Sequence, residues 1–323
     1  MQRNLLQYLI ITLKGIAMGM ADVVPGVSGG TIAFISGIYE EFVNSLNSIN
    51  ADAFKLLFKF RIKDFWKHIN GNFLVSLALG IAISIVSLSK MIIYLLENEP
   101  VLLWAFFFGL IIASILFIGK QITEWNARVI VAIVLGVVVS YYITIAEPAS
   151  SPDSTIYVFF SGFIAIIAMI LPGISGAFIL LLMGSYPTII GAISKLSEGI
   201  STADTEMLVQ SGSMLAVFAV GAVLGLLSFS RVLAWMFKNY HNTTLAVLTG
   251  FMIGSLNKVW PWKETLSMRI NSHGVEVPFL QKSVLPCNFT DGDSQIPMVL
   301  VLAVVGFMVI FLLEKLSKKD ANS

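Results

Sequence analysis

Long apolar stretches separated by short polar segments dominate this chain. Six of them approach the roughly 20 residues with which a helix crosses a bilayer, and they carry almost no charge. They are residues 73–96, 101–119, 129–146, 212–237, 243–260 and 297–313. Two further apolar stretches, 15–45 and 156–192, are each interrupted by proline and glycine. This pattern predicts an all-α polytopic membrane protein.

The two interrupted stretches carry the same short motif. The first contains Pro25-Gly26-Val27-Ser28-Gly29-Gly30, and the second contains Pro172-Gly173-Ile174-Ser175-Gly176. A break in a helix within hydrocarbon leaves backbone N–H and C=O groups unpaired, at several kcal/mol each, so it is tolerated only where protein or a cavity surrounds it. Two such breaks in matching halves of a chain indicate the binding site of a transporter.

The two halves also match outside the motifs. An offset of 141 positions pairs Gly80 with Gly221 and Lys90 with Arg231, and an offset of 147 pairs the two motif prolines. The sequence therefore predicts two repeats, 1–148 and 149–323. Each repeat holds one broken segment followed by three membrane spans.

The charge distribution predicts how these repeats are oriented. Basic residues lie on both sides of the first broken segment, and cytoplasmic flanks of membrane helices collect Lys and Arg. We therefore predict re-entrant hairpins at 15–45 and 156–192, inverted repeats, and cytoplasmic N- and C-termini. The alternative is that each broken segment crosses once, which gives eight spans and parallel repeats. Under the predicted inverted topology, residues 261–296 form a polar outer loop.

Composition narrows the function classes. The chain is 57% hydrophobic and 12% charged, with a net charge of +1 and a single cysteine, Cys287. These values are not those of a soluble globular domain, and no basic tract points to nucleic acid. One cysteine allows no intrachain disulfide. No His, Asp or Glu spacing suits a metal, so we expect no metal, no cofactor and no catalytic centre.

Each motif provides the groups that bind an anion. Proline ends the incoming half-helix, glycine allows close approach of a ligand, and the N-terminus of the outgoing half-helix presents unpaired N–H groups. The candidate binding residues are Pro25, Gly26, Ser28, Gly29, Gly30, Thr31, Pro172, Gly173, Ser175 and Gly176. The competing interpretation is that the glycines only allow close helix packing.

Four charged residues extend this candidate site. Lys90 and Arg231 occupy matching positions within two spans, where a cation is expensive and is by default a functional hypothesis, the alternative being that each snorkels to the interface. Asp22 precedes the first motif and Glu40 follows it. Both are proton-coupling candidates, although Asp22 could equally satisfy backbone donors around the turn.

The run from Gly15 to Thr31, with Gly37-Ile38-Tyr39-Glu40, resembles the signature of the PopT family of polyprenyl-phosphate transporters. So does the run Leu171-Pro172-Gly173-Ile174-Ser175-Gly176-Ala177-Phe178, with Gly184-Ser185-Tyr186. The resemblance covers nearly the whole chain apart from the loop 261–296. It implies a transporter in the bacterial cytoplasmic membrane that returns undecaprenyl phosphate, the lipid carrier of cell-wall precursors, from the outer to the inner leaflet.

Three functions therefore compete. The first is a lipid-phosphate flippase, with protons as the driving ion through Asp22. The second is a secondary transporter of a small soluble anion. The third, ranked lowest, is an intramembrane enzyme acting on lipid phosphate, which needs a nucleophile beside a base. The expected partners are the polyprenyl phosphate and the bilayer. A homo-oligomer is one option that the sequence leaves open.

Overall fold

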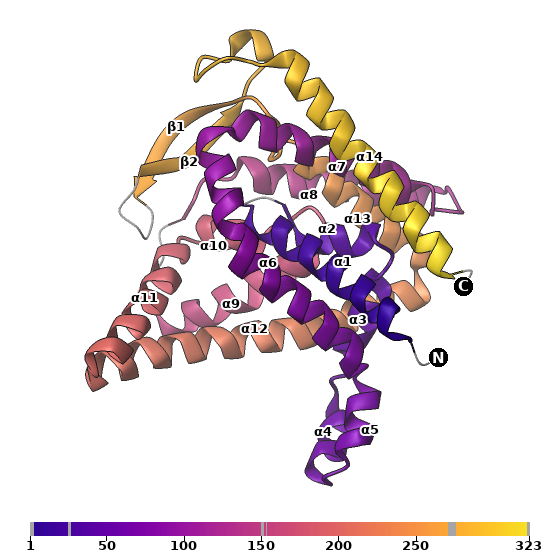
Figure 1. The fold of residues 1–323 in the computed structure, drawn as a ribbon, viewed down its shortest axis with the longest axis vertical. Helices are drawn as coiled ribbons and strands as arrows, with labels where there is room; N and C mark the ends of the chain where they lie inside the picture. Colours follow the sequence, from indigo (N-terminus) through magenta and orange to yellow (C-terminus); the bar gives the residue numbers. More distant parts are fainter. Residues whose placement is uncertain (1–2, 25–26, 150–151, 153, 271–275, 322–323) are drawn as a thin grey trace.

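A computed structural model describes residues 3–24, 27–149, 152, 154–270 and 276–321 of the chain (Figure 1). The first half contains α1 (Leu5–Val23), α2 (Gly29–Ile35), α3 (Tyr39–Asn47), α4 (Ala51–Phe58), α5 (Ile62–His68), α6 (Gly71–Asn98), α7 (Pro100–Gly119) and α8 (Ala127–Ile145). The second half contains α9 (Thr155–Ile170), α10 (Gly176–Leu182), α11 (Tyr186–Thr202), α12 (Thr205–Asn239), α13 (His241–Ser255), β1 (Lys263–Ile270), β2 (Glu276–Ser283), the 3-10 turn η1 (Pro286–Asn288) and α14 (Ile296–Ala321).

The helices have the length and surface of membrane helices. Within the described ranges, five are long and apolar enough to cross a bilayer, and the bent pair α10–α11 would make a sixth. Large apolar side chains are exposed along them, as on α8 at Val131, Val134, Leu135 and Val138. Such a surface suits hydrocarbon rather than water. The prediction of a multi-pass helical membrane protein is confirmed.

Close glycine contacts fix how α1 packs against α6. A Cβ added at Gly15 would collide with the carbonyl oxygen of Leu77, and one at Gly19 would lie 2.8 Å from the carbonyl oxygen of Ile81. Residue numbers rise together along the two helices, so α1 and α6 run parallel. Helices that approach this closely need small residues at the contact.

The same contact recurs between α9 and α12. A Cβ at Gly221 would collide with the carbonyl oxygen of Phe159, and one at Gly225 would lie 2.5 Å from that of Phe163. These two helices are also parallel. Gly221 corresponds to Gly80 of α6 at the offset of 141, and Gly80 in turn abuts the carbonyl oxygen of Thr12.

A second type of helix pair also occurs in both halves of the chain. Gly109 of α7 abuts the carbonyl oxygen of Ala303 in α14, and Gly250 of α13 abuts that of Ile133 in α8. Gly250 is the partner of Gly109 at the offset of 141. The connections agree as well, because Glu99 between α6 and α7 has φ −135° and ψ 49°, and Tyr240 between α12 and α13 has φ −139° and ψ 49°.

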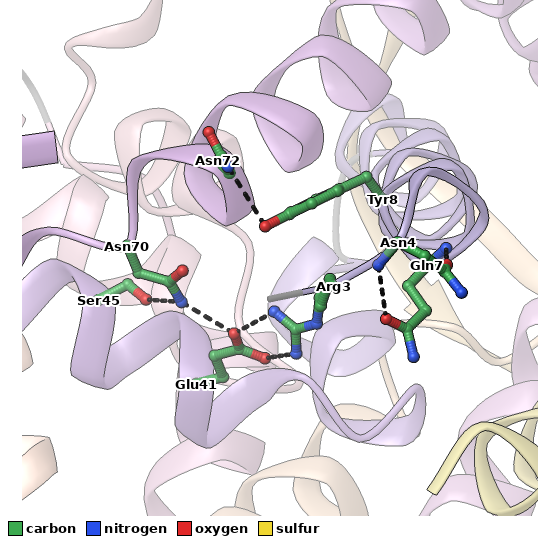
Figure 2. A network of polar contacts seen from close by, with 8 residues as sticks. All are labelled: Arg3, Asn4, Gln7, Tyr8, Glu41, Ser45, Asn70 and Asn72. Carbon is green, nitrogen blue, oxygen red and sulfur yellow. Dashed lines mark hydrogen bonds and ion pairs between the residues drawn. The ribbon is translucent and has the colours of Figure 1, made fainter. Parts of the chain in front are cut away.

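A polar network ties the start of α1 to the starts of α3 and α6 (Figure 2). Arg3 donates two hydrogen bonds to Glu41, at 2.6 and 2.7 Å, and the Asn70 amide donates to the same carboxylate at 2.8 Å. The Asn72 amide donates to the Tyr8 hydroxyl at 3.3 Å. After α1 and α2, the chain has therefore returned to the end from which α1 began.

The loop 261–296 contains more structure than a polar connection. Strands β1 and β2 pair antiparallel within it, and the pairing has a bulge near Ser267. The predicted span 243–260 is correspondingly shorter, because α13 ends at Ser255 and residues 256–262 lead into the hairpin. At another point on the molecule, α4 and α5 project from the helical body (Figure 1).

Candidate functional site

The two broken segments meet, and hydrogen bonds join them. The N–H of Gly173 donates to Oγ1 of Thr31 at 3.0 Å. The hydroxyl of Ser28 lies 3.1 Å from the carbonyl oxygens of both Met169 and Leu171, to which it donates. Side chains of the first segment therefore pair with backbone groups that the second segment leaves unpaired, as hydrocarbon surroundings require. We call this contact the junction, and define it by Ser28, Thr31, Gly173 and Ser175.

The first segment turns between α1 and α2. Ser28 caps α2, because its Oγ accepts from the N–H of Gly30 at 3.1 Å. Asp22, in the last turn of α1, accepts from the N–H of Gly29 at 2.7 Å through its Oδ1. A carboxylate of the chain itself thus occupies the N-terminus of α2, where we expected an external anion. This is the local role that the sequence left open for Asp22.

The second segment turns between α9 and α10. Gly173 has φ +85°, a conformation that residues with a Cβ rarely adopt. Ser175 caps α10 by accepting from the N–H of Phe178 at 3.5 Å. A Cβ at Gly173 would lie 2.9 Å from Oγ of Ser255, so the end of α13 packs directly on the turn.

The junction is closed in this structure. Thr31 is fully buried, and Ser28 and Ser175 are 1% and 4% exposed. Gly30 abuts the carbonyl oxygen of Ile170, and the hydroxyl of Tyr39 donates to that same oxygen at 3.1 Å. An anion could reach these groups only if the two segments separated.

Only some of the other predicted residues are among those that the structure describes. Pro25 and Gly26 lie outside the described residues, as does the side chain of Lys90. Arg231 is exposed on α12, on the same stripe as the exposed Leu224 and Trp235. That placement suits a long side chain that reaches along lipid to the interface.

Glu40 and the remaining motif residues have contacts within the protein that differ from those of the junction. Glu40 is exposed at the start of α3, with a carboxylate oxygen 3.9 Å from Nδ1 of His241. Pro172 is buried in the second turn, and a Cβ at Gly176 would lie 2.6 Å from the carbonyl oxygen of Ala165. Among the residues described, no group of three His, Cys, Asp or Glu is placed to hold a metal.

Sequence reasoning missed two lysines near the junction. Nζ of Lys258 lies 4.0 Å from the ring centroid of Phe178, and Nζ of Lys263 lies 3.5 Å from that of Trp104. The sequence pattern places Lys258 at the end of the predicted span 243–260 and Lys263 in the polar loop 261–296, and gives neither a role. The available signal was their position around Trp260 and Trp262, but the burial of Lys263 depends on α7, which is distant in sequence.

Apolar membrane helices arranged around two interlocked broken segments define a multi-pass membrane transporter. The chain belongs to the undecaprenyl phosphate translocase-like family, whose model matches residues 18–277. A "Polyprenyl-phosphate transporter" of Vibrio cholerae is 44% identical over 317 residues, covering 97% of this chain and 98% of that protein. One of Staphylococcus aureus with the same name is 32% identical over 261 residues, covering 77% and 85%. These relatives are named as transporters rather than enzymes. No solved structure matches the chain significantly.

Proposed function

We propose that this protein returns a polyprenyl phosphate, undecaprenyl phosphate in cell-wall synthesis, from the outer to the inner leaflet of the bacterial cytoplasmic membrane. The names of its relatives support the substrate class. The observation that carries the proposal is the junction itself, where buried hydroxyl and N–H groups of both broken segments come together.

The helix directions support re-entrant hairpins. If α1 and its continuation crossed the membrane once, α6 would start on the far side and run antiparallel to α1. The glycine contacts instead make α1 and α6 parallel, and Glu41 and Asn70 lie beside Arg3. The segment α1–α2–α3 therefore enters and leaves the membrane on one side.

The helix count supports inverted repeats. Helices α6, α7 and α8 are joined by Glu99 and by residues 120–126, connections too short to recross a bilayer. After these three crossings, α9 starts on the side opposite to α1. Because Lys59, Arg61 and Lys63 flank the first hairpin, the side from which α1 starts is cytoplasmic. The three crossings of the second repeat return the C-terminus to this side, so both termini lie there.

We propose that the junction binds the phosphate head when the two segments separate. Separation breaks the bonds of Ser28, Thr31 and the N–H of Gly173 across the junction and uncovers the buried hydroxyl of Ser175. These groups are hydrogen-bond donors suited to phosphate oxygens. The helices α2 and α10 have only 7 residues each, so their dipoles contribute less than these donors. The isoprenoid tail stays in lipid beside the apolar outer surface.

Asp22 provides a physical link between proton binding and transport. Its carboxylate holds the N–H of Gly29, a donor that a phosphate oxygen could also use. Protonation weakens this bond because a neutral carboxyl group is a poorer acceptor. A proton and a phosphate head therefore both favour release of Asp22 from α2, which couples the movement of one to the other.

Leaflet exchange in liposomes tests this function. A fluorescent polyprenyl phosphate and an impermeant quencher report how fast the lipid crosses, with a fluorescent polyprenol as the neutral control. We expect the protein to accelerate leaflet exchange of the polyprenyl phosphate but not of the polyprenol. Uptake of inorganic phosphate without lipid exchange would replace the proposal with a soluble-anion transporter.

A further inference from the structure

The two lysines near the junction have an unusual environment. Lys263, at the start of β1, is only 7% exposed, and Lys258 is partly buried. Each ammonium group faces an aromatic ring, Trp104 of α7 for Lys263 and Phe178 of α10 for Lys258. Such contacts attract a cation through the ring quadrupole but supply no counter-charge.

Neither lysine has an anionic partner in the part of the chain that the structure describes. The ion pairs there include no contact to Lys258 or Lys263, and Nζ of Lys263 has no hydrogen-bond partner. Arg3, at the opposite end of the helical body, is by contrast paired with Glu41 at 2.6 Å (Figure 2). A buried cation without a counter-charge is costly.

Burial lowers the pKa of both lysines, and the charge of Lys258 acts on Lys263 as well. Burial lowers the pKa of Lys258 from its usual 10.5 to about 8. Burial lowers the pKa of Lys263 well below its usual value, and the charge of Lys258 lowers it further. No carboxylate on the surrounding elements that are described offsets these effects. An anion placed between the lysines would favour the protonated form of both.

Lys258 is close to the junction in the fold. Its N–H donates to the carbonyl oxygen of Ser255 at 2.8 Å, and Ser255 packs against Gly173. The ring under its ammonium group belongs to Phe178, whose N–H is capped by Ser175. Lys258 thus lies between the second broken segment and the β1–β2 hairpin, whose first residue is Lys263.

We propose that Lys258 and Lys263 form a binding site for a phosphate monoester, which receives the head group on the outer side before it enters the junction. The proposal rests on the function proposed above and adds residues to it. The phosphate could be carried by a lipid or be free in solution, and the same two cations suit either. Trp260 and Trp262, interfacial residue types, flank Lys258 and Lys263 and favour the lipid.

Binding to the full chain in detergent tests the site. The probe is geranylgeranyl phosphate, followed by tryptophan fluorescence, with geranylgeraniol and inorganic phosphate as separate ligands. The variants are Lys258→Met and Lys263→Met, which keep the apolar stem and remove the charge. Lys282→Met, at an exposed lysine of the same hairpin, is the matched control. Because Lys→Met removes an unpaired charge, thermal unfolding should show no loss of stability.

We expect each of the two Lys→Met variants to weaken binding of geranylgeranyl phosphate at least tenfold, with Lys282→Met unchanged. Binding by the wild type should fall as pH rises through about 8, because Lys258 then loses its charge. Lys258→Arg should keep its affinity above pH 8.

The other outcomes separate the two proposals. Equal binding of geranylgeranyl phosphate by the wild type and both Lys→Met variants would overturn the lysine site and leave the proposed function standing. If inorganic phosphate bound in place of the lipid and the variants lost it, the site would stand and its phosphate would be the free ion. A wild type that bound neither ligand would overturn both proposals.

Discussion

The backbone N–H of Gly173 donates to the side-chain oxygen of Thr31 at 3.0 Å, across 142 residues of sequence. Both groups are buried, so each depends on the other for a partner. This bond and those of Ser28 hold two helix breaks together that neither half of the chain could stabilise alone. The junction is consequently both a structural requirement of the fold and the place where a polar head group could find donors.

Replacing Thr31 by Val should destabilise the protein by about 1–3 kcal/mol, because the buried N–H of Gly173 loses its acceptor. Thr249→Val is the matched control, since the buried hydroxyl of Thr249 donates to the carbonyl oxygen of Leu245 within its own helix rather than to another segment. Thermal unfolding in detergent measures the difference. Equal stability of the two variants would show that the Gly173–Thr31 bond contributes nothing.

Asp22→Asn should separate the two roles of this residue. The Asn oxygen can still accept from the N–H of Gly29, so the fold should persist, but the side chain no longer carries a proton. We expect leaflet exchange to lose its dependence on a pH gradient, while Asp22→Ala also loses stability. If leaflet exchange by the Asp22→Asn variant still depended on the pH gradient, Asp22 would not be the proton-coupling residue.

Gly80→Ala should destabilise the α1–α6 pair by about 1–3 kcal/mol, because the added methyl group meets the backbone of Thr12. Gly191→Ala is the control. Gly191 lies inside α11 with nothing within 4 Å of its Cβ position, so alanine there should stabilise the helix by about 0.5–1 kcal/mol. Unfolding midpoints that shift alike in both variants would contradict the close packing of α1 on α6.

Arg231→Gln should slow leaflet exchange by about threefold or more, because the exposed cation attracts an anionic head group from the lipid. Arg231→Lys should retain most of the rate, since lysine keeps the charge and a long stem. Leaflet-exchange rates of the wild type and the two Arg231 variants, measured in liposomes, test this prediction. Equal loss in both variants would point to guanidinium geometry, and no loss in Arg231→Gln would place Arg231 outside the path.

Much of the fold is predictable because hydrocarbon imposes strict rules on sequence. Long apolar stretches with almost no charge mark the spans, and the matched breaks at Pro25-Gly26 and Pro172-Gly173 mark the segments that must find partners. The pairing of Gly80 with Gly221 in the sequence reappears as equivalent contacts with α1 and α9. These features are local or periodic, so the chain alone reveals them.

The remaining features depend on contacts between distant residues. Nothing near Asp22 in sequence shows that its carboxylate takes the N–H of Gly29 rather than facing a ligand. The exposure of Arg231 is decided by which face of α12 packs on α9 and α3. Lys263 is buried only because α7 brings Trp104 over it. Sequence patterns identify such residues as unusual but do not place them.

Locking the junction tests the central claim most directly, because transport requires its two segments to separate. Ser28→Cys and Leu171→Cys, in a Cys287→Ser background, place one thiol in each broken segment, at two residues that are in contact because the Ser28 hydroxyl lies 3.1 Å from the backbone carbonyl oxygen of Leu171. We predict that oxidation of the double variant reduces leaflet exchange of polyprenyl phosphate to the rate of protein-free liposomes, and that a reductant restores it. The oxidant should not change the rate of the single Ser28→Cys variant. Undiminished exchange by fully cross-linked protein would show that the head group crosses elsewhere.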